Sequence, residues 1–555
     1  MLATVALNKP RTGILPGLLC FVAPIVTLGV IVAISVIVLN APQDTFRSPD
    51  ENAGQLFTKT LAETGRLDYS ADYLSNDVEN LLHPRGALTH DGRAVPFGFL
   101  GLPVVYAPFY KLLGGDVRYI AIGLSVLATV ALASAGARLV PERPWLAWLA
   151  VLSVSPLIYF FNRPFLNALP ATAFECVAAY FVVRYFQSGS GARRELVWAS
   201  VAFALAAFMR YELAIFQTLF VTVMVLHKRG TAWRSVMGDL SAYVAPTLLL
   251  FVVPVFALNQ YVYGSPFTYG YGLFNEAYFP NRVATGDFPG NVPEQMRSVL
   301  MPSYPFDLGV AGSSLVHQAI GIAPSFVAVC CLGLAHLVWR GRVHWRAYLA
   351  YGLLAIYIYL YRGAGISWLA EEDSPHLEAS VIRYALPLYV AGYFLVVYLL
   401  DRVRWSGAAA GVVALLAVAS VASIVSETPG NLLHIRDQLR AGHELAKEVI
   451  LPETEPDAVI YTDVYDKILG QQRIVAAWWG GSLATQTGFF RPDEVARSMS
   501  RLRASRPVYL LVAEEEDVLP RLNGALAAYG LKASPTRAGR LYSIDVAAEG
   551  GRPER

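Results

Sequence analysis

Charge is scarce in this 555-residue chain, and the two signs nearly cancel. Lys and Arg number 44, Asp and Glu number 42, and charged residues make up only 15% of the total. A net charge of +2 without a basic cluster argues against nucleic acid as a partner. Apolar residues reach 55% and the mean hydropathy is +0.44, which is typical of a polytopic protein of the lipid bilayer.

Cysteine is also sparse, and all four lie in apolar runs: Cys20, Cys176, Cys330 and Cys331. In such runs a thiol packs as a small hydrophobic side chain more readily than it pairs, so we predict no disulfide framework. The sequence has no Cys/His spacing typical of zinc sites, and its C-terminal region has no Gly-rich phosphate loop. We therefore assign no metal ligand and no cofactor. A divalent ion held weakly by adjacent carboxylates is an alternative that nothing in the sequence indicates.

Long apolar runs are abundant and predict eleven membrane spans. They lie near residues 14 to 40, 116 to 140, 144 to 162, 166 to 187, 196 to 212, 213 to 227, 240 to 262, 315 to 339, 345 to 361, 383 to 401 and 406 to 426. We expect the first run to be a retained span, because no small-residue cleavage site precedes the Pro42–Pro49 stretch.

Basic residues in the short loops orient these spans. With Lys9 and Arg11 inside, every cytoplasmic turn is basic: Arg138/Arg143, Arg193/Arg194, Lys228/Arg229/Arg234, Arg340/Arg342/Arg346 and Arg402/Arg404. Residues 41–115, 263–314 and the region after 427 then lie outside the cytoplasm, in a multi-pass protein of the plasma (inner) membrane. Phe97–Leu113 would invert this threading if it spanned, so we expect an interfacial or re-entrant helix there.

The C-terminal region has a different character. Strand-like runs at Ala458–Tyr461, Arg473–Ala477 and Val508–Val512 alternate with helical patterns at Asp493–Arg503 and Glu515–Tyr529. Such alternation predicts a small α/β domain. We therefore expect a mainly α membrane protein in two parts, which are a transmembrane helical bundle over residues 1–430 and an extracytoplasmic α/β domain over residues 431–555.

Two adjacent carboxylates, Asp50 and Glu51, follow the first apolar run within Ser48-Pro49-Asp50-Glu51. An ionisable group within a span costs about 2.5 to 3.5 kcal/mol, so charges gathered at one membrane face need a purpose. On the predicted external face this pair is accompanied by further polar and charged residues: His83, Arg85, Lys111, Arg163, Arg210, Glu212, His376 and Arg383. Such a group suits a catalyst better than a simple pore.

The order of several motifs resembles that of a known family. The motifs are the acidic pair after the first span, the Asp91–Pro103 turn and helix start, Arg210-Tyr211-Glu212, the aromatic run Tyr263–Tyr271, and Arg383–Leu388. Together they resemble the GT-C superfamily of glycosyltransferases over roughly residues 10–430, especially bacterial relatives of the protein O-mannosyltransferases and the lipid A aminoarabinose transferase. One departure is Val95-Pro96-Phe97-Gly98-Phe99, where the family more usually has Tyr-Pro-Pro-Gly.

The resemblance implies a multi-span helical bundle with interfacial helices in the first external loop, and a polyprenyl-phosphate-linked sugar as the donor. It implies inverting transfer to a hydroxyl of a glycan, glycolipid or protein acceptor outside the cytoplasm. Asp50 matches the family's first-loop acid and is predicted to be the general base, with Glu51 in support. Two alternatives stay open: Glu51 is the base, or Asp50 is only an N-cap of the following helix.

A leaving phosphate needs cations that remain charged beside lipid, which favours arginine. Arg210 and Arg383 are the first candidates for binding the donor phosphate. Four residues follow as further candidates: His83, Arg85, Lys111 and Arg163. For each arginine, the alternative is that it reaches toward lipid headgroups.

A second set of residues is predicted to contact the substrate: Glu212, Tyr269, Tyr271, His376 and Tyr384. Glu212 lies two residues from Arg210, and the alternative is that it only neutralises this arginine. The aromatic residues have an equally good alternative as part of an interfacial belt.

Two other functions remain open. A lipid-linked sugar transporter or flippase without transferase activity would also place ionisable groups in the membrane, but near mid-span and with an internal repeat, which the sequence lacks. A sensor that uses its external domain would leave the Asp50 group without a purpose. The sequence does not distinguish mannose, arabinofuranose, another pentose or a hexose as the sugar.

Overall fold

The computed structural model describes residues 14–39, 42, 44–98, 100–116, 118–189, 192–230, 232–278, 283–284, 290–294, 312, 316, 320–340, 382–426, 431–469, 472–477, 491–513 and 515–547. The chain forms two compact units of three segments each. The first comprises Met1–Asn40, Val117–Leu258 and Pro293–Ile435, and the second comprises Ala41–Asp116, Asn259–Val292 and Arg436–Arg555. The first long loop thus groups with the C-terminal region, although the two are far apart in sequence.

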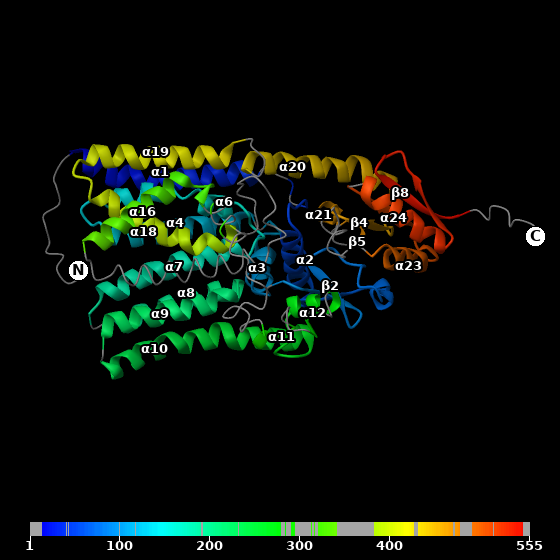
Figure 1. Cartoon of the computed structure of the whole chain (residues 1–555), viewed down its shortest axis with the longest axis horizontal. Coiled ribbons are helices and arrows are strands. Elements are labelled where there is room, and N and C mark those ends of the chain that lie inside the picture. The colour runs from blue at the N-terminus through cyan, green and yellow to red at the C-terminus, as the bar shows by residue number, and fades with distance from the viewer. Residues whose placement is uncertain are drawn as a thin grey trace, which may run out of the picture. The chain divides into compact units, whose positions relative to one another are not determined.

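The first unit is helical (Figure 1). Its helices are α1 (Ile14–Leu39), α4 (Arg118–Leu139), α5 (Pro144–Val151), α6 (Ser155–Phe161), α7 (Ala168–Gln187), α8 (Ala192–Met209), α9 (Glu212–Arg229), α10 (Trp233–Thr247), α16 (Pro324–Trp339), α18 (Ile382–Asp401) and α19 (Ser406–Val425). A π-helical turn, Leu248–Val252, joins α10 to α11 (Val253–Tyr263). Helices α4, α7, α8 and α10 pack in succession, and α5 packs against α1, α4, α18 and α19.

Six helical stretches in the described ranges are long and apolar enough to cross a membrane, or seven if the bent pair of α5 and α6 counts as one span. They are Gly17–Ile37, Arg118–Leu139, Ala168–Gln187, Trp233–Tyr263, Ile382–Asp401 and Ser406–Val425. Each coincides with an expected span, which confirms a multi-pass membrane protein. The described residues do not reach the expected count of eleven, and the expected span at 345–361 lies outside them.

Four expected spans look different in the structure. In the one expected at 315–339, the described helix is α16, which has only 16 residues. The spans expected at 196–212 and 213–227 are the 18-residue helices α8 and α9, each of which carries three charged residues near its ends. Those charges disfavour burial of the whole helix in lipid. The span expected at 144–162 is broken, because α5 and α6 meet at 63°. Pro156 lies in the first turn of α6, where its missing N–H costs no hydrogen bond, so a new helix begins there.

Asp239 of α10 ties several helix ends of the first unit together. Its buried carboxylate accepts hydrogen bonds from Arg229 at 2.7 Å, from Arg193 at 3.1 Å and from the Tyr185 hydroxyl at 2.7 Å. These donors lie at the ends of α9, α8 and α7. A buried carboxylate is tolerated where its charge is matched, so loop arginines of the predicted cytoplasmic side also close the helix ends.

The second unit combines helices with two sheets (Figure 1). Its elements are α2 (Pro49–Thr64), β1 (Tyr69–Ser70), η1 (Asp72–Asn76), β2 (Ala87–His90), β3 (Arg93–Pro96), α3 (Gly101–Leu112), α12 (Gly270–Tyr278), η5 (Leu445–Ile450), η6 (Leu451–Glu453), β4 (Val459–Thr462), α21 (Asp466–Leu469), β5 (Ile474–Ala477), α23 (Pro492–Arg503), β6 (Val508–Leu511), α24 (Glu515–Ala528), β7 (Leu531–Pro535) and β8 (Leu541–Val546). Helix α20 (Leu432–Glu444) enters this unit at Arg436.

A five-stranded sheet forms the centre of the second unit, in the order β5-β4-β6-β8-β7. Strands β5, β4 and β6 are parallel, whereas β8 is antiparallel to β6 and β7. The four residues of β4 are all buried, as expected of a central strand covered on both faces. The expected strand and helix patterns match β4, β5, β6, α23 and α24, which confirms an α/β fold there. Strands β7 and β8 were not predicted.

Residues of the first long loop complete the core around this sheet. Leu81 and Leu82 are buried in the same hydrophobic cluster as Tyr461 of β4. At the end of β5, the Ala477 N–H donates to the carbonyls of Leu81 and His83 at 3.0 and 3.1 Å. The loop is therefore a component of the α/β fold.

The expected turn at Asp91-Gly92 is the tip of the β2–β3 hairpin. His90 pairs with Arg93, so the loop has two residues, and both have positive φ values of 50° and 70°. Asp-Gly is a favoured sequence for such a turn because Gly adopts positive φ without steric cost. The turn is confirmed, and β1 extends the hairpin to a three-stranded antiparallel sheet.

Helix α3 follows this hairpin and replaces the helix expected at Phe97–Leu113. Its 12 residues span about 18 Å, which is shorter than the roughly 30 Å hydrocarbon layer. A helix of this length does not cross a membrane, in line with the expectation.

Gly86 is predicted to tolerate no side chain. Its φ is +94°, and a Cβ there would lie 2.6 Å from Ala53 Cβ and 2.9 Å from the Pro49 carbonyl oxygen in α2. Gly86→Ala is expected to destabilise the protein by about 1–3 kcal/mol through strain and overpacking, measured as a lower unfolding midpoint. Gly524→Ala in α24 is the matched control, because nothing lies within 4 Å of its Cβ position. Equal stability of the two variants would contradict the close approach of Gly86 to α2.

Candidate functional site

The acidic pair opens α2, and a capping box closes its first turn. The Ser48 hydroxyl accepts a hydrogen bond from the Glu51 N–H at 3.3 Å, and Glu51 Oε2 accepts one from the Ser48 N–H at 3.2 Å. Pro49 occupies the first helical position, which suits its fixed φ and missing N–H. The alternative that Asp50 is the N-cap is therefore wrong, because Ser48 has that role.

The two carboxylates have different environments. Glu51 is only 5% exposed and belongs to the capping box, whereas Asp50 is half-buried. Successive side chains on a helix point about 100° apart, so the pair does not converge on one ligand atom. Asp50 lies in the first turn, where the helix dipole stabilises a negative charge. It is the member of the pair that the capping box does not use.

A buried ion pair holds the loop that flanks this helix start. Asp466 Oδ1 accepts hydrogen bonds from Arg85 Nη2 at 2.6 Å and Nε at 3.0 Å, and Oδ2 accepts one from the Arg85 N–H at 2.9 Å. The two side chains are 0% and 8% exposed, respectively. Asn52 of α2 donates to the Asp466 carbonyl at 3.2 Å. The first residue of α21 therefore holds both the loop and α2.

His83 and Arg85, expected at the donor phosphate, are both built into this loop. The two ring nitrogens of His83 lie 3.0 Å from the Pro84 carbonyl oxygen and 2.9 Å from the Asn80 carbonyl oxygen. Both residues are buried, and these contacts position the loop. Lys111 differs from them, since it is exposed in the last turn of α3.

The aromatic segment after α11 packs on the end of the β2–β3 hairpin. The Tyr263 hydroxyl donates to the Pro96 carbonyl at 2.6 Å. The rings of Tyr271 and Phe97 are arranged edge to face, with their centroids 5.3 Å apart. Tyr269 is buried and Tyr271 is half-buried. These contacts stabilise the second unit, and contact of either tyrosine with a sugar stays a prediction.

In the first unit, Arg210 lies at the centre of a buried cluster between α8 and α9. Its Nε and Nη2 donate to Glu212 Oε1 at 2.9 and 2.6 Å, and its Nη1 donates to the Arg383 carbonyl at 2.6 Å. The Cζ atoms of Arg210 and Arg383 lie 4.7 and 5.5 Å from the centroid of the Tyr384 ring, a cation–π arrangement. The structure thus brings together four predicted site residues.

Glu175 of α7 also belongs to this cluster and was not predicted. It is buried and interacts electrostatically with Arg210 and Glu212. Arg210 therefore lies near two acidic side chains. A carboxylate within the apolar run of α7 is the sequence signal that would have identified Glu175, because ionisable residues within spans are costly and usually functional.

Two predicted residues remain, Arg163 and His376. Arg163 follows α6, is buried, and donates to the Tyr159 hydroxyl at 3.0 Å. His376 lies outside the described residues. In the part of the chain that the structure describes, no group of three or more His, Cys, Asp or Glu side chains is arranged to hold a metal ion.

The helices and sheets define the class of protein, a multi-pass membrane protein with an additional α/β unit. No family model and no curated protein matches the chain. Among solved structures, the chain is similar to ArnT from Cupriavidus metallidurans in the apo state, at 14% identity and a TM-score of 0.44, with 95% of this chain and 98% of that chain covered. A likeness of this size supports no conclusion about the activity.

Asp466→Ala is predicted to be strongly destabilising. Removing one partner of a buried ion pair leaves the Arg85 guanidinium uncompensated, which costs about 3–5 kcal/mol. Asp437→Ala is the matched control, since Asp437 is 53% exposed and pairs with Arg436 at the surface, where an ion pair contributes about 0–1 kcal/mol. The midpoints of thermal unfolding of the full chain measure the difference. Equal midpoints for both variants would show that the pair does not hold the loop.

Proposed function

We propose that this protein is a GT-C-type glycosyltransferase of the inner membrane. It transfers a sugar from a polyprenyl-phosphate donor to a hydroxyl of a glycan, lipid or protein outside the cytoplasm. The observation that supports this proposal is the position of Asp50 in the first turn of α2, after the first span. Gly86 packs closely against this turn, and Asn52 in it donates a hydrogen bond to Asp466 of α21. A base must be held within hydrogen-bond reach of its hydroxyl, whereas a solvated surface acid needs no such support.

Asp50 is the general base in this proposal. Its carboxylate takes the proton of the acceptor hydroxyl, and the oxygen forms a bond to the anomeric carbon. The bond from that carbon to the phosphate oxygen breaks, and polyprenyl phosphate leaves with the electron pair. A single displacement of this kind inverts the anomeric configuration.

The environment of the acidic pair favours Asp50 over Glu51 for this role. The Glu51 carboxylate is buried and accepts the Ser48 N–H, so it stabilises the first turn. Its contribution is to position Asp50. The alternative that Glu51 is the base stays open, and the two residues are separated by mutation below.

The cations that bind the donor phosphate are assigned to Arg383 and Arg210. Arg210 is paired with Glu212, and Arg383 is half-buried beside Tyr384. We therefore place Arg383 first for direct phosphate contact, with Arg210 orienting it through the bond to its carbonyl. Arginine suits this role because its planar fork pairs with phosphate oxygens and stays charged.

The other predicted contacts keep lesser roles in the proposal. Lys111 and Arg163 are further candidates for the phosphate, and Tyr269, Tyr271 and His376 are candidates for the sugar. His83 and Arg85 support the loop beside α2, since both are buried and engaged there.

A lipid-linked sugar transporter is the second candidate, and Glu175 is the observation that favours it. Glu175 is a buried carboxylate within the apolar helix α7, beside an arginine and another acid. Ionisable residues buried in spans often mark transport pathways. A transporter would move the lipid-linked sugar across a bilayer without cleaving it.

Asp50→Asn is expected to lower sugar transfer by about 10²–10⁴-fold, because the amide cannot accept the hydroxyl proton. Glu51→Gln should lower it far less, since glutamine also completes a capping box. The assay follows transfer from polyprenyl-phosphate sugars in proteoliposomes, with unfolding midpoints recorded for both variants. Loss of transfer in Glu51→Gln alone would make Glu51 the base. Movement of intact donor lipid by a wild type that transfers no sugar would favour the transporter.

Arg383→Ala is expected to raise the KM for the donor by about tenfold or more, because it removes a charged contact to phosphate. Arg402→Ala is the matched control. Arg402 follows the other end of α18, with its Cζ 5.1 Å from the Tyr398 ring centroid, and has no assigned role. The measurement is the dependence of transfer rate on donor concentration. An unchanged KM in Arg383→Ala would remove this residue from the phosphate site.

A further inference from the structure

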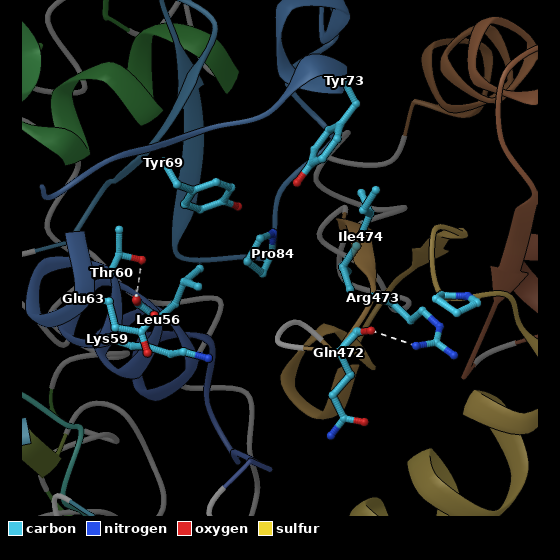
Figure 2. Close-up of a pocket in the computed structure, with 12 residues that line it drawn as sticks. Leu56, Lys59, Thr60, Glu63, Tyr69, Tyr73, Pro84, Gln472, Arg473 and Ile474 are labelled. Carbon is cyan, nitrogen blue, oxygen red and sulfur yellow. Dashed lines mark hydrogen bonds between the residues drawn. The ribbon is translucent and has the colours of Figure 1, made fainter. Parts of the chain in front are cut away.

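A cavity of about 330 Å³ lies within the second unit (Figure 2). This volume is at the lower end of the roughly 300–1,000 Å³ typical of ligand pockets. One wall is a face of α2, where Leu56, Lys59, Thr60 and Glu63 recur at spacings of three and four residues. Strand β5 contributes Ile474 to the opposite wall. The cavity is therefore built from secondary-structure elements distant in sequence.

Two tyrosines of the first long loop complete the lining. Figure 2 shows Tyr69 and Tyr73 beside Pro84, with their hydroxyls directed toward the space between α2 and β5. Burial raises the pKa of both hydroxyls, and the nearby Arg506 opposes this only in part at Tyr73. Both hydroxyls therefore stay protonated and can act as hydrogen-bond donors. Rings with such donors suit a ligand that has an apolar face and a hydroxyl-rich edge.

The charges around the cavity suit a neutral ligand. Lys59 and Glu63 are four residues apart on α2, so their opposite charges balance. Arg473 is engaged within the protein, since its guanidinium donates to the Thr454 hydroxyl at 3.1 Å and to the Leu451 carbonyl at 3.0 Å. These neutral oxygens leave the charge of Arg473 in place, but they use its Nε, Nη1 and Nη2 donors, so in the described lining the guanidinium is not oriented toward a phosphate. A neutral, polar ligand fits better than a phosphate or an isoprenoid.

We propose that this cavity is a saccharide subsite that binds an uncharged glycan acceptor. Its role as an acceptor subsite depends on the proposed transferase activity. Its preference for neutral sugars depends only on the residues that line it. The tyrosine rings stack on a sugar face, and the polar groups of α2 bind its hydroxyls.

Helix α2 links this subsite to the proposed base. Leu56 and Glu63 follow Asp50 by six and thirteen residues, or about 9 and 20 Å along the helix axis. The sugar whose hydroxyl reacts at Asp50 therefore does not occupy the cavity. A neighbouring unit of an extended glycan does, so the proposal favours an oligosaccharide acceptor over a single sugar.

Binding of neutral trisaccharides to the full chain in nanodiscs tests the proposal. Mannotriose, cellotriose and maltotriose serve as probes, followed by saturation-transfer NMR and titration calorimetry. Tyr73→Ala is expected to weaken binding about tenfold or more, and Lys59→Ala and Thr60→Val about fivefold each. Lys532→Ala in β7 is the matched control for Lys59→Ala and is expected to bind as the wild type does. Unfolding midpoints show that each variant is folded.

The outcomes separate this inference from the proposed function. Trisaccharide binding that depends on Tyr73 supports the subsite even if no donor supports transfer, which would overturn only the transferase activity. Absence of binding for all three sugars, equal loss in Lys532→Ala, or preference for a tetra-alanine peptide overturns the subsite. Transfer to an extended glycan that is unchanged in Tyr73→Ala also overturns it and leaves the transferase activity intact.

Discussion

The buried ion pair between Arg85 and Asp466 is the constraint on which the second unit depends. A buried pair adds little net stability, because desolvation offsets most of the attraction, but removing one partner is costly. Its value here is geometric. The Asp466 carboxylate holds both the backbone and the side chain of Arg85, and its carbonyl holds Asn52 of α2. The first long loop, the start of α2 and the C-terminal α/β fold therefore form one compact unit. These contacts fix the position of a carboxylate at the start of α2, as a catalytic group requires.

The predicted site residues are divided between the two units. In the second unit, one acid of the pair stabilises the helix start and the other is the proposed base. In the first unit, Arg210 is paired with Glu212 and also interacts with the buried Glu175. The ion pair with Glu212 makes the burial of Arg210 tolerable. Arg383 is half-buried beside the Tyr384 ring, and it is the residue that we propose for direct contact with the phosphate.

Local patterns predicted much of this architecture. Apolar runs identified six spans, Asp91-Gly92 identified a turn, and alternation identified β4 to β6. The features that the sequence did not predict depend on contacts between distant segments or on single residues. Ser48 takes the N-cap because proline follows it at the first helical position, so the alternative that Asp50 is only an N-cap is wrong. Strands β7 and β8 close the sheet through pairing with each other and with β6, which periodicity in short segments does not reveal. Glu175 was missed because it lies within an otherwise apolar helix.

Hydropathy and turn chemistry act between neighbouring residues, so they were enough to indicate a membrane protein, its α/β region and the acidic pair after the first span. The residues that fix the loop and the helix around that pair came only from tertiary contacts. Asp466 lies 381 positions after Arg85, and nothing in the local sequence of either residue indicates the other. The same contacts assign His83 and Arg85 to the support of a loop, and they form the cavity between α2 and β5. Which side chains meet depends on how distant segments pack around a shared core, and that is a property of the whole fold.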